Sequence, residues 1–334
     1  MFQKLKTAFI LSAIVLLMSC GAKQKQFVQM AGYAQGTTYH ISYLDTRESL
    51  YKVQVDSILN VIDFAMSTYN KDAEISIFNS ADTTLTIGKH FQEVLQRSIE
   101  ISKLTQGDFD VTVGPLVNAW GFGADPTVKG DVKPEEILDQ VGYQKIQLNG
   151  TQLSKTHPNL KLDVNAIAQG YSVDVIGVFL ESKGVTDYMV ELGGEIRCNG
   201  RNADNNLWRI GIDKPSEEIQ EERFQAIVNI DNRSLATSGN YRKFYVDENG
   251  MKYVHTINPH TGYPVKSNLL SASVIAPDAM TADAFATTFM VMGLEKSIAF
   301  SKKHPELYVY FVYVNKKGEW ETYISPGMEE QIVN

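Results

Sequence analysis

The chain has 334 residues, a formal net charge of −8 at pH 7 and only two cysteines. This length is enough for one large domain, or for a domain of two lobes, with a sizeable hydrophobic core. Because the overall charge is acidic and no basic run occurs, nucleic-acid binding is disfavoured.

The N-terminus has the features of a secretory signal. A basic start is followed by an apolar run and then by Ser19 and Cys20. The run is too short for a transmembrane helix, which needs about 20 residues. Leu-Met-Ser-Cys, ending at Cys20, resembles the lipobox of bacterial lipoproteins, in which the cysteine is acylated and anchors the chain. An ordinary signal with an incidental cysteine is the alternative.

This segment sets the expected domain organisation. We predict a lipoprotein signal peptide at residues 1–19, a lipid-anchored tether at 20–27 and a folded domain at 28–330. The protein would then be anchored to a membrane of the bacterial cell envelope and face the periplasm. Cys198 would be the one cysteine left, which excludes an intramolecular disulfide and cysteine-based zinc sites. We expect Cys198 to be a small buried hydrophobe.

Hydrophobic periodicity and turn residues predict the elements in chain order. A hairpin at residues 27–43 turns at Gly36, and helices follow at 50–66, 91–104, 134–141 and 166–183. Strands are expected at 188–192, 208–212, 224–230, 241–246 and 269–275. Helices at 279–292 and 294–303 and strands at 307–314 and 320–324 complete the chain. Without strict βαβ alternation, the order favours an α+β fold: one domain of two lobes with mixed sheets and flanking helices.

Two segments near the C-terminus suggest a site. Residues 255–264 form a turn-rich loop that presents His255, and the helix expected at 279–292 carries Asp283 and Thr287. Positions i and i+4 share a helix face, so these two side chains would offer a hard cation such as Mg²⁺ two oxygen ligands. Each feature taken alone is more often a surface loop or a solvent-facing helix. Together, a histidine and a metal site are suited to chemistry on phosphates. A bound cation would also compensate the acidic charge of the protein near an anionic phosphate ligand.

Five further blocks extend the pattern. They are Gly-Thr-Thr-Tyr at 36–39, Met-Ser-Thr-Tyr-Asn at 66–70, Gly-Asp-Phe-Asp-Val-Thr-Val-Gly-Pro-Leu at 107–116 with Trp-Gly-Phe-Gly at 120–123, Leu-Asp-Val-Asn-Ala-Ile-Ala-Gln-Gly-Tyr at 162–171, and Leu-Ala-Thr-Ser-Gly at 235–239. Each alone has a plainer explanation, such as a turn, a packed aromatic or, for Asp163, a helix N-cap. In this order, with the histidine loop and the Ala-Asp-Ala helix, they resemble the FAD:protein FMN transferase (ApbE) family from about residue 27 to residue 324.

The resemblance implies a reaction and its partners. Family members use FAD and Mg²⁺, attach the FMN half through a phosphoester bond to a threonine of an acceptor flavoprotein, and release AMP. The acceptor would be a redox-pump subunit or a related extracytoplasmic flavoprotein, and the flavin would lie in the cleft between the lobes. No GxGxxG follows a strand, so FAD would not be bound in the Rossmann manner.

Matched position by position, the resemblance also implies residue roles. His255 would deprotonate the acceptor threonine. The metal ligands would be the backbone oxygen of Ala166 and the side chains of Asp283 and Thr287. The flavin-contacting positions would be Gln35, Tyr69, Asp108, Phe109, Asp110, Asp163, Gln169 and Ile257.

The sequence departs from the family pattern at several positions. They are Gln35, Gln169, Asn258, His260 and Ala286, and they bear on flavin affinity and on the charge of the metal site. Two other functions stay open. One is an FAD pyrophosphatase, in which water replaces threonine and the products are FMN and AMP. The other is a non-enzymatic flavin-binding lipoprotein, which would need neither His255 nor a metal. Mg²⁺ and Mn²⁺ are not distinguished, because both accept oxygen ligands.

Overall fold

The computed structural model describes residues 25–47, 50–81, 84–125, 132–215, 223–240, 244–246 and 252–333. The expected signal peptide and Cys20 lie outside these ranges. Strand β1 (Gln26–Ala34) begins at Gln26, so the last two residues of the expected tether belong to a sheet. Among the described helices, none has the length and apolar character that crossing a membrane requires.

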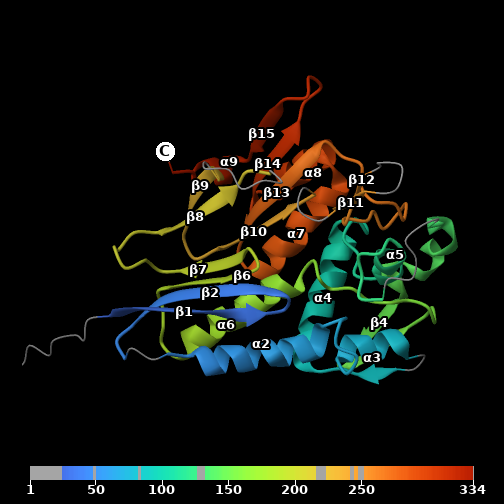
Figure 1. Ribbon diagram of the computed structural model, residues 1–334, viewed down its shortest axis with the longest axis horizontal. Helices are drawn as coiled ribbons and strands as arrows, with labels where there is room; N and C mark the ends of the chain where they lie inside the picture. The colour runs from blue at the N-terminus through green and yellow to red at the C-terminus, as the bar shows by residue number, and fades with distance from the viewer. Residues whose placement is uncertain are drawn as a thin grey trace, which may run out of the picture.

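An antiparallel sheet of eight strands forms the centre of the fold (Figure 1). Its spatial order is β1, β2 (Thr37–Asp45), β6 (Tyr188–Leu192), β7 (Glu195–Asn199), β10 (Ser234–Gly239), β13 (Leu269–Ala276), β14 (Tyr308–Val314) and β15 (Trp320–Ile324). The expected first hairpin is confirmed as β1 and β2. Gln35 and Gly36 both have positive φ, which a two-residue turn between twisted strands requires.

Helices cover one face of this sheet, and a hairpin covers the other. Helices α6 (Ala168–Ser182) and α7 (Ala279–Met292) pack on the first face, and α8 (Leu294–Lys303) packs against α7 and β14. The second face is closed by β8 (Trp208–Asp213), β9 (Phe224–Ile230) and the short α9 (Pro326–Glu329). Neighbouring residues of a strand point to opposite faces of the sheet. In β10, Leu235 therefore packs in the core under the hairpin and Ala236 in the core under the helices. Cys198 is buried in the core under the hairpin, as expected.

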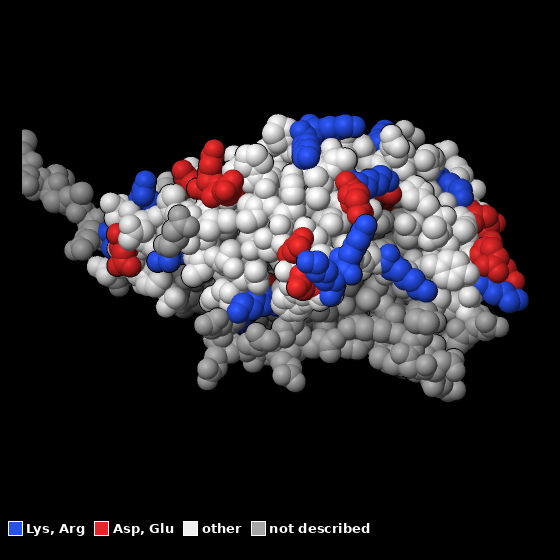
Figure 2. Space-filling view, turned by 90° about the horizontal axis from the view of Figure 1, so that it is seen from above, with Lys and Arg blue, Asp and Glu red and all other residues white. Residues whose placement is uncertain are grey.

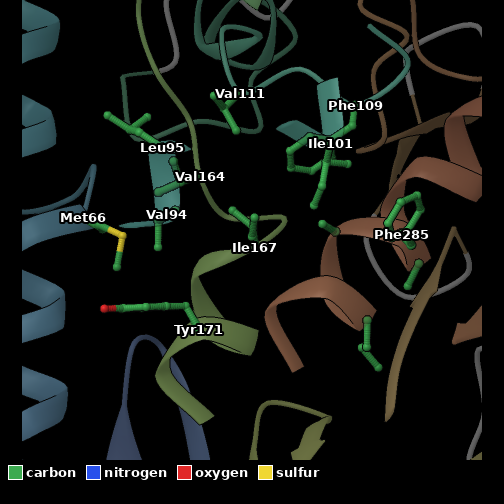
Figure 3. Packing of buried hydrophobic residues seen from close by; sticks show 14 of the residues in the cluster. Met66, Val94, Leu95, Ile101, Phe109, Val111, Val164, Ile167, Tyr171 and Phe285 are labelled. Atoms are coloured by element: carbon green, nitrogen blue, oxygen red, sulfur yellow. The ribbon is translucent and has the colours of Figure 1, made fainter. Parts of the chain in front are cut away.

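A second group of elements packs beside the sheet. It comprises α2 (Lys52–Met66), α3 (Glu74–Ser80), α4 (Lys89–Leu104), α5 (Gly114–Ala119), a small sheet of β3 (Leu85–Thr86), β5 (Gln152–Lys155) and β4 (Ile146–Asn149), and the pair β11 (Phe244–Val246) and β12 (Lys252–Val254). Figure 3 shows the core that joins this group to the sheet: Met66 of α2, Leu95 of α4, Tyr171 of α6 and Phe285 of α7 lie in one cluster. This core fixes the positions of α6 and α7 relative to the second group.

The α+β class is confirmed, and the structure differs from the prediction in several details. The described strands pair antiparallel where mixed sheets were expected, because tight turns such as those after β1 and β6 permit only antiparallel neighbours. Residues 134–141 form two short 3₁₀ turns (Pro134–Glu136 and Leu138–Gln140), since so short a segment rarely propagates an α-helix. Of the strand expected at 241–246, Phe244–Val246 is observed and residues 241–243 lie outside the described ranges.

Charges of both signs are interspersed on the face of the molecule seen in Figure 2. On that face several Lys and Arg side chains lie beside Asp and Glu side chains, and a few stand apart at the upper edge. Close mixing of signs gives a weak net field, so this face does not present the single-sign surface that attracts a polyanion.

Candidate active site

The first turn of α6 crosses α7 at Gly170. The amide of Gly170 donates to Oδ2 of Asp283 over 3.0 Å. In a regular helix the same amide would donate to the carbonyl of Ala166, four residues earlier. The helix therefore begins at Ala168 rather than at Ala166, and the Ala166 carbonyl is left without its usual amide partner. Two of the expected metal ligands, Ala166 and Asp283, thus belong to one helix junction.

The crossing depends on the absence of a side chain at Gly170. A Cβ there would come 2.3 Å from the carbonyl oxygen of Ala279 and 2.9 Å from Cβ of Asp283. The first atom belongs to the backbone of α7, and the second is bonded directly to it. We expect Gly170→Ala to destabilise the protein by roughly 1–3 kcal/mol, the usual cost of overpacking. Thermal unfolding measures this loss.

Gly177 in the same helix provides the matched control. A Cβ at Gly177 would come 2.8 Å from Cδ and Nε of Arg197 and 2.9 Å from the hydroxyl of Tyr188, which are side-chain atoms only. Because side chains adjust at lower cost than the backbone of a packed helix, we expect Gly177→Ala to lower the melting temperature less than Gly170→Ala. Equal melting temperatures for the two variants would contradict the close α6–α7 crossing.

Asp174, which the sequence analysis missed, fixes the start of α7. Its carboxylate accepts hydrogen bonds from the amides of Ala279 at 3.0 Å and Met280 at 2.8 Å, and from the Arg197 guanidinium at 3.0 Å. The first amides of a helix have no partner within the helix, so Asp174 satisfies two of them. Burial raises the pKa of Asp174 to about 6. A carboxylate one turn after the glycine of the 162–171 block was the signal available in the sequence.

Asp283 is a buried carboxylate, and only its Oδ2 receives a hydrogen bond from the described residues. Loss of hydration raises the pKa of Asp283 to about 7, and the neighbouring charge of Asp174 adds to the shift. Burying a carboxylate is costly unless a partner or a cation compensates it. The second oxygen of the Asp283 carboxylate and the Ala166 carbonyl, which accepts no hydrogen bond within α6, are therefore suited to bind a cation.

The third expected ligand, Thr287, lies one turn after Asp283 on α7. Its Oγ1 is 3.0 Å from Oγ of Ser238 at the end of β10. Ser238 belongs to the Ala-Thr-Ser-Gly block, so three sequence blocks meet around α7. The described ranges contain no cluster of three or more His, Cys, Asp or Glu side chains suited to a metal. A site built from Ala166, Asp283 and Thr287 would instead combine one carboxylate with two neutral oxygens.

The histidine loop is attached to the same end of β10. Oγ1 of Thr256 donates to Oδ1 of Asn240 over 2.8 Å, and Asn240 directly follows β10. This bond brings the neighbour of His255 to within two residues of Ser238. The ring of His255 lies edge-on to Phe122, with the ring centroids 6.5 Å apart.

The Trp-Gly-Phe block holds the loop from the other side. Nε1 of Trp120 donates to the carbonyl of Gly262 over 2.7 Å, and the Trp120 ring lies 5.9 Å from that of Tyr263. Ile257, an expected flavin contact, is buried in a small core with Leu116 and Trp120. The loop is thus fixed at both ends, and a flavin contact by Ile257 stays a prediction.

Two expected flavin contacts lie where the first hairpin reaches α6. Nε2 of Gln35 donates to Oγ of Ser172 over 2.8 Å. A Cβ at Gly193 would come 3.1 Å from Nε2 of Gln169 and 3.0 Å from Cγ2 of Thr37, so both side chains lie near this glycine. Tyr69, after the end of α2, is 69% exposed. An aromatic ring so exposed is available to stack on a planar ligand.

The turn at residues 108–110 uses its side chains within the protein. Asp108 is buried and paired with Lys296 and with His260, whose Nε2 is 3.2 Å from Oδ1 of Asp108. Phe109 lies in the shared core (Figure 3). Flavin contacts by these side chains stay predictions. His260, a departure from the family pattern, supplies one of the two side chains that pair with Asp108.

Asp110 and Asp163 also have partners within the fold. Asp110 accepts hydrogen bonds from the amide and hydroxyl of Thr112 at 2.8 and 2.6 Å and from the Tyr143 amide at 2.8 Å, and burial raises its pKa. Asp163 accepts the Asn165 amide at 2.9 Å, and loss of hydration raises its pKa as well. Asp163 does not cap α6, whose N-cap position is residue 167, so the explanation of Asp163 as a helix cap is wrong.

A groove of about 710 Å³ lies elsewhere, between α2 and the start of α4. None of the residues that line it is an expected site residue. This groove does not outline the flavin cleft, which stays a prediction.

Known proteins match this chain along most of its length. The profile of the ApbE family matches residues 35–311. The FAD:protein FMN transferase of Haemophilus influenzae is 37% identical over 332 residues, which cover 95% of each chain. The FAD:protein FMN transferase of Vibrio cholerae is 38% identical over 300 residues, which cover 86% of this chain and 88% of the relative.

Solved structures match the fold as well. The flavin transferase ApbE from Vibrio cholerae superposes with a TM-score of 0.82 at 35% identity, covering 92% of this chain and 99% of that chain. The apo form of the Pseudomonas stutzeri flavinyl transferase ApbE gives a TM-score of 0.80 at 29% identity, covering 93% of this chain and 99% of that chain. The family profile, the relatives and the fold agree, and the chain belongs to the ApbE family.

Proposed function

We propose that this protein is an FAD:protein FMN transferase, which cleaves FAD and attaches FMN through a phosphoester bond to a threonine of an acceptor protein. The observation that carries the proposal is the convergence of three segments on α7. The hydrogen bonds Gly170–Asp283, Ser238–Thr287 and Thr256–Asn240 join the start of α6, the end of β10 and the histidine loop. The relatives that match over most of the chain carry the name of this activity.

The proposed step is a substitution at phosphorus. The hydroxyl oxygen of the acceptor threonine bonds to the phosphorus of the FMN half, and the bond from that phosphorus to the bridging oxygen breaks. AMP leaves with the bridging oxygen. His255 accepts the hydroxyl proton, a role that suits imidazole because its unperturbed pKa is about 6.5. The Phe122 contact and the Thr256–Asn240 bond position the loop that carries this ring.

The proposed metal is Mg²⁺, held by the Ala166 carbonyl, Asp283 and Thr287. When bound, it would neutralise charge on the diphosphate oxygens. The structure fits this role because the Asp283 carboxylate has an unused oxygen and the Ala166 carbonyl lies outside the helix ladder. A set made only of oxygen ligands suits Mg²⁺ and also accepts Mn²⁺.

We also propose where the reaction takes place. The lipobox supports acylation of Cys20 and anchoring in the bacterial cell envelope, with the domain facing the periplasm. The acceptor would then be an extracytoplasmic flavoprotein subunit of the redox-pump type. An acidic protein without a basic run has no feature that favours nucleic acid as a further partner.

Mass spectrometry of an acceptor fragment tests the activity. Incubated with the protein, FAD and Mg²⁺, a threonine-bearing fragment is expected to gain the mass of one FMN group and to release one AMP. A fragment whose threonine is replaced by alanine is the matched control and should gain nothing. Hydrolysis of FAD without labelling would assign a pyrophosphatase, and bound but intact FAD would assign a flavin-binding protein.

A further inference from the structure

The outer side of α2 exposes several large apolar side chains next to small polar ones such as Ser57 and Asn60. Leu50, just before the helix, and Val53, Val61 and Phe64 are 61, 78, 52 and 53% exposed. A helix turns about 100° per residue, so the three apolar positions within α2 fall within an arc of about 80°. The inner side of α2, which includes Leu59, is buried. A surface helix normally presents a polar outer side, so this apolar stripe calls for an explanation.

The groove of about 710 Å³ runs beside this stripe. Val61, Phe64 and Ala65 line it on α2 together with the polar side chains of Asp56, Ser57 and Asn60, and Glu74, Lys89 and His90 line it as well. The side chain of Lys89 is largely exposed and lies 3.6 Å from Glu93. Apolar side chains bordered by polar and charged ones match the boundary between acyl chains and headgroups in a lipid bilayer.

The N-terminal segment places this stripe close to the expected anchor. The described structure starts at Lys25, five residues after Cys20. Five extended residues span at most about 18 Å. Gln26 pairs with Asp45 at the end of β2, and Leu50 follows Asp45 after five residues. In Figure 1, β1 and α2 begin at the same end of the molecule.

We propose that the apolar stripe of α2 is a membrane-contact face, with Val53, Val61 and Phe64 in the interfacial layer of the bilayer. This inference rests on the anchor that we proposed above, and it adds the orientation of the domain. An anchor alone leaves the domain free to rotate, whereas a second contact close to the anchor restricts it. The short reach of the tether favours lipid as the occupant of this face over another protein.

Fluorescent labels at two positions test the face in the full chain. Phe64→Cys lies in α2, and Trp320→Cys lies in β15 on the opposite side of the molecule (Figure 1). Cys198 is buried, so an environment-sensitive dye reacts at the new cysteine. In membranes from producing cells we expect the label at position 64 to be quenched by nitroxide lipids and protected several-fold from iodide. The label at position 320 should show the reverse.

Two outcomes would overturn the proposal. Equal quenching by iodide at both positions would show that the stripe faces water. Protection from iodide without quenching by nitroxide lipids would show that a protein covers it. In the double variant Val53→Glu/Phe64→Glu, a label at Val61→Cys should be quenched less by nitroxide lipids. Trp320→Glu should leave that quenching unchanged.

Failure of the anchor or of the activity would be seen separately. If the protein is absent from the membrane fraction, phospholipid vesicles are added to the soluble protein with Cys20→Ser, so that the label reacts at position 64 alone. Lack of nitroxide quenching there also overturns the proposed membrane contact. FMN transfer to a soluble acceptor fragment in detergent should be unchanged in the double variant, because Val53 and Phe64 are not site residues. Loss of transfer in the unaltered protein would contradict the proposed function and leave the face intact.

Discussion

Replacing His255 with alanine is expected to slow FMN transfer by roughly 10²–10⁴-fold while FAD still binds. A threonine hydroxyl is a poor nucleophile and needs a base within reach of its proton. His255 lies on a loop held by Thr256 and Trp120 next to the α7 junction. The expected flavin contacts come from other residues, so FAD affinity should change little. Acceptor labelling by mass spectrometry and FAD binding by equilibrium dialysis measure the two effects.

His304 is the matched control for loss of an imidazole. It stacks on Phe300 at the end of α8 and pairs with Glu306. We expect His304→Ala to transfer FMN at the unaltered rate. Normal transfer by His255→Ala would exclude the base role. Parallel loss of transfer and of FAD affinity would assign His255 to substrate binding instead.

Replacing Asp283 is expected to remove turnover and metal dependence together. Asp283→Asn is the sharpest variant because it keeps the volume and an oxygen for the Gly170 amide but loses the charge. Mg²⁺ that binds the folded state should raise the melting temperature of the unaltered protein. It should not raise that of Asp283→Asn or Asp283→Ala. An unchanged Mg²⁺-dependent shift in these variants would place the metal elsewhere.

The same carboxylate predicts how metal binding depends on pH. Since burial raises the pKa of Asp283 to about 7, the metal-free protein holds a proton there at lower pH, and the cation must displace it. Mg²⁺ should therefore bind more weakly at pH 6 than at pH 8, with more proton release at pH 6. Calorimetry in two buffers measures both, and equal affinities at the two pH values would contradict the assignment.

The raised pKa of Asp283 also makes the stability of the metal-free protein depend on pH. The unfolded chain has the ordinary value of 3.8, so between about pH 4 and about pH 7 only the folded state keeps this proton. The contribution of Asp283 to the free energy of unfolding therefore falls as pH rises through this window, by at most about 1.4 kcal/mol per pH unit, and is constant above it. Asp283→Asn should show a smaller decline in metal-free buffer than the unaltered protein, because the raised pKa of Asp174 remains.

The sequence predicted the C-terminal helices to their ends, and the reason is local. Asp278 caps α7 by accepting the Thr281 amide at 2.7 Å, and Gly293 ends it with positive φ. Such signals depend only on neighbouring residues and can be read without the fold. The α+β class followed from the same reading, because it needs only the order of the elements.

Strand β10 was missed because its stability is not local. The segment Ser234–Gly239 has one β-branched residue, Thr237, and includes Ala236 and Gly239, which belong to residue types depleted in strands. The strand forms because it pairs along its length with β13 and at one end with β7, and because Leu235 and Ala236 fill the cores on its two sides. Pairing partners far apart in the chain are not visible in a single sequence.

Some residues of the candidate site could be predicted from the sequence, and others could not. The motif blocks predicted Asp283, Thr287 and His255 by position. They did not reveal Asp174 or the Ser238 contact, because these act across the fold: Asp174 and Ala279 are 105 positions apart, and Ser238 and Thr287 are 49 apart. Motifs thus predicted the reacting groups, whereas the groups that position them required coordinates.

The burial of Cys198 has a consequence for how the protein matures. Its thiol lies under the β8–β9 hairpin, and burial raises the pKa of the thiol, which keeps it in the unreactive protonated form. With Cys20 used for acylation, an exported chain would reach its native state without any oxidoreductase, and no disulfide would have to be reshuffled. Yield in an oxidising compartment would then be independent of the redox machinery that many secreted enzymes require.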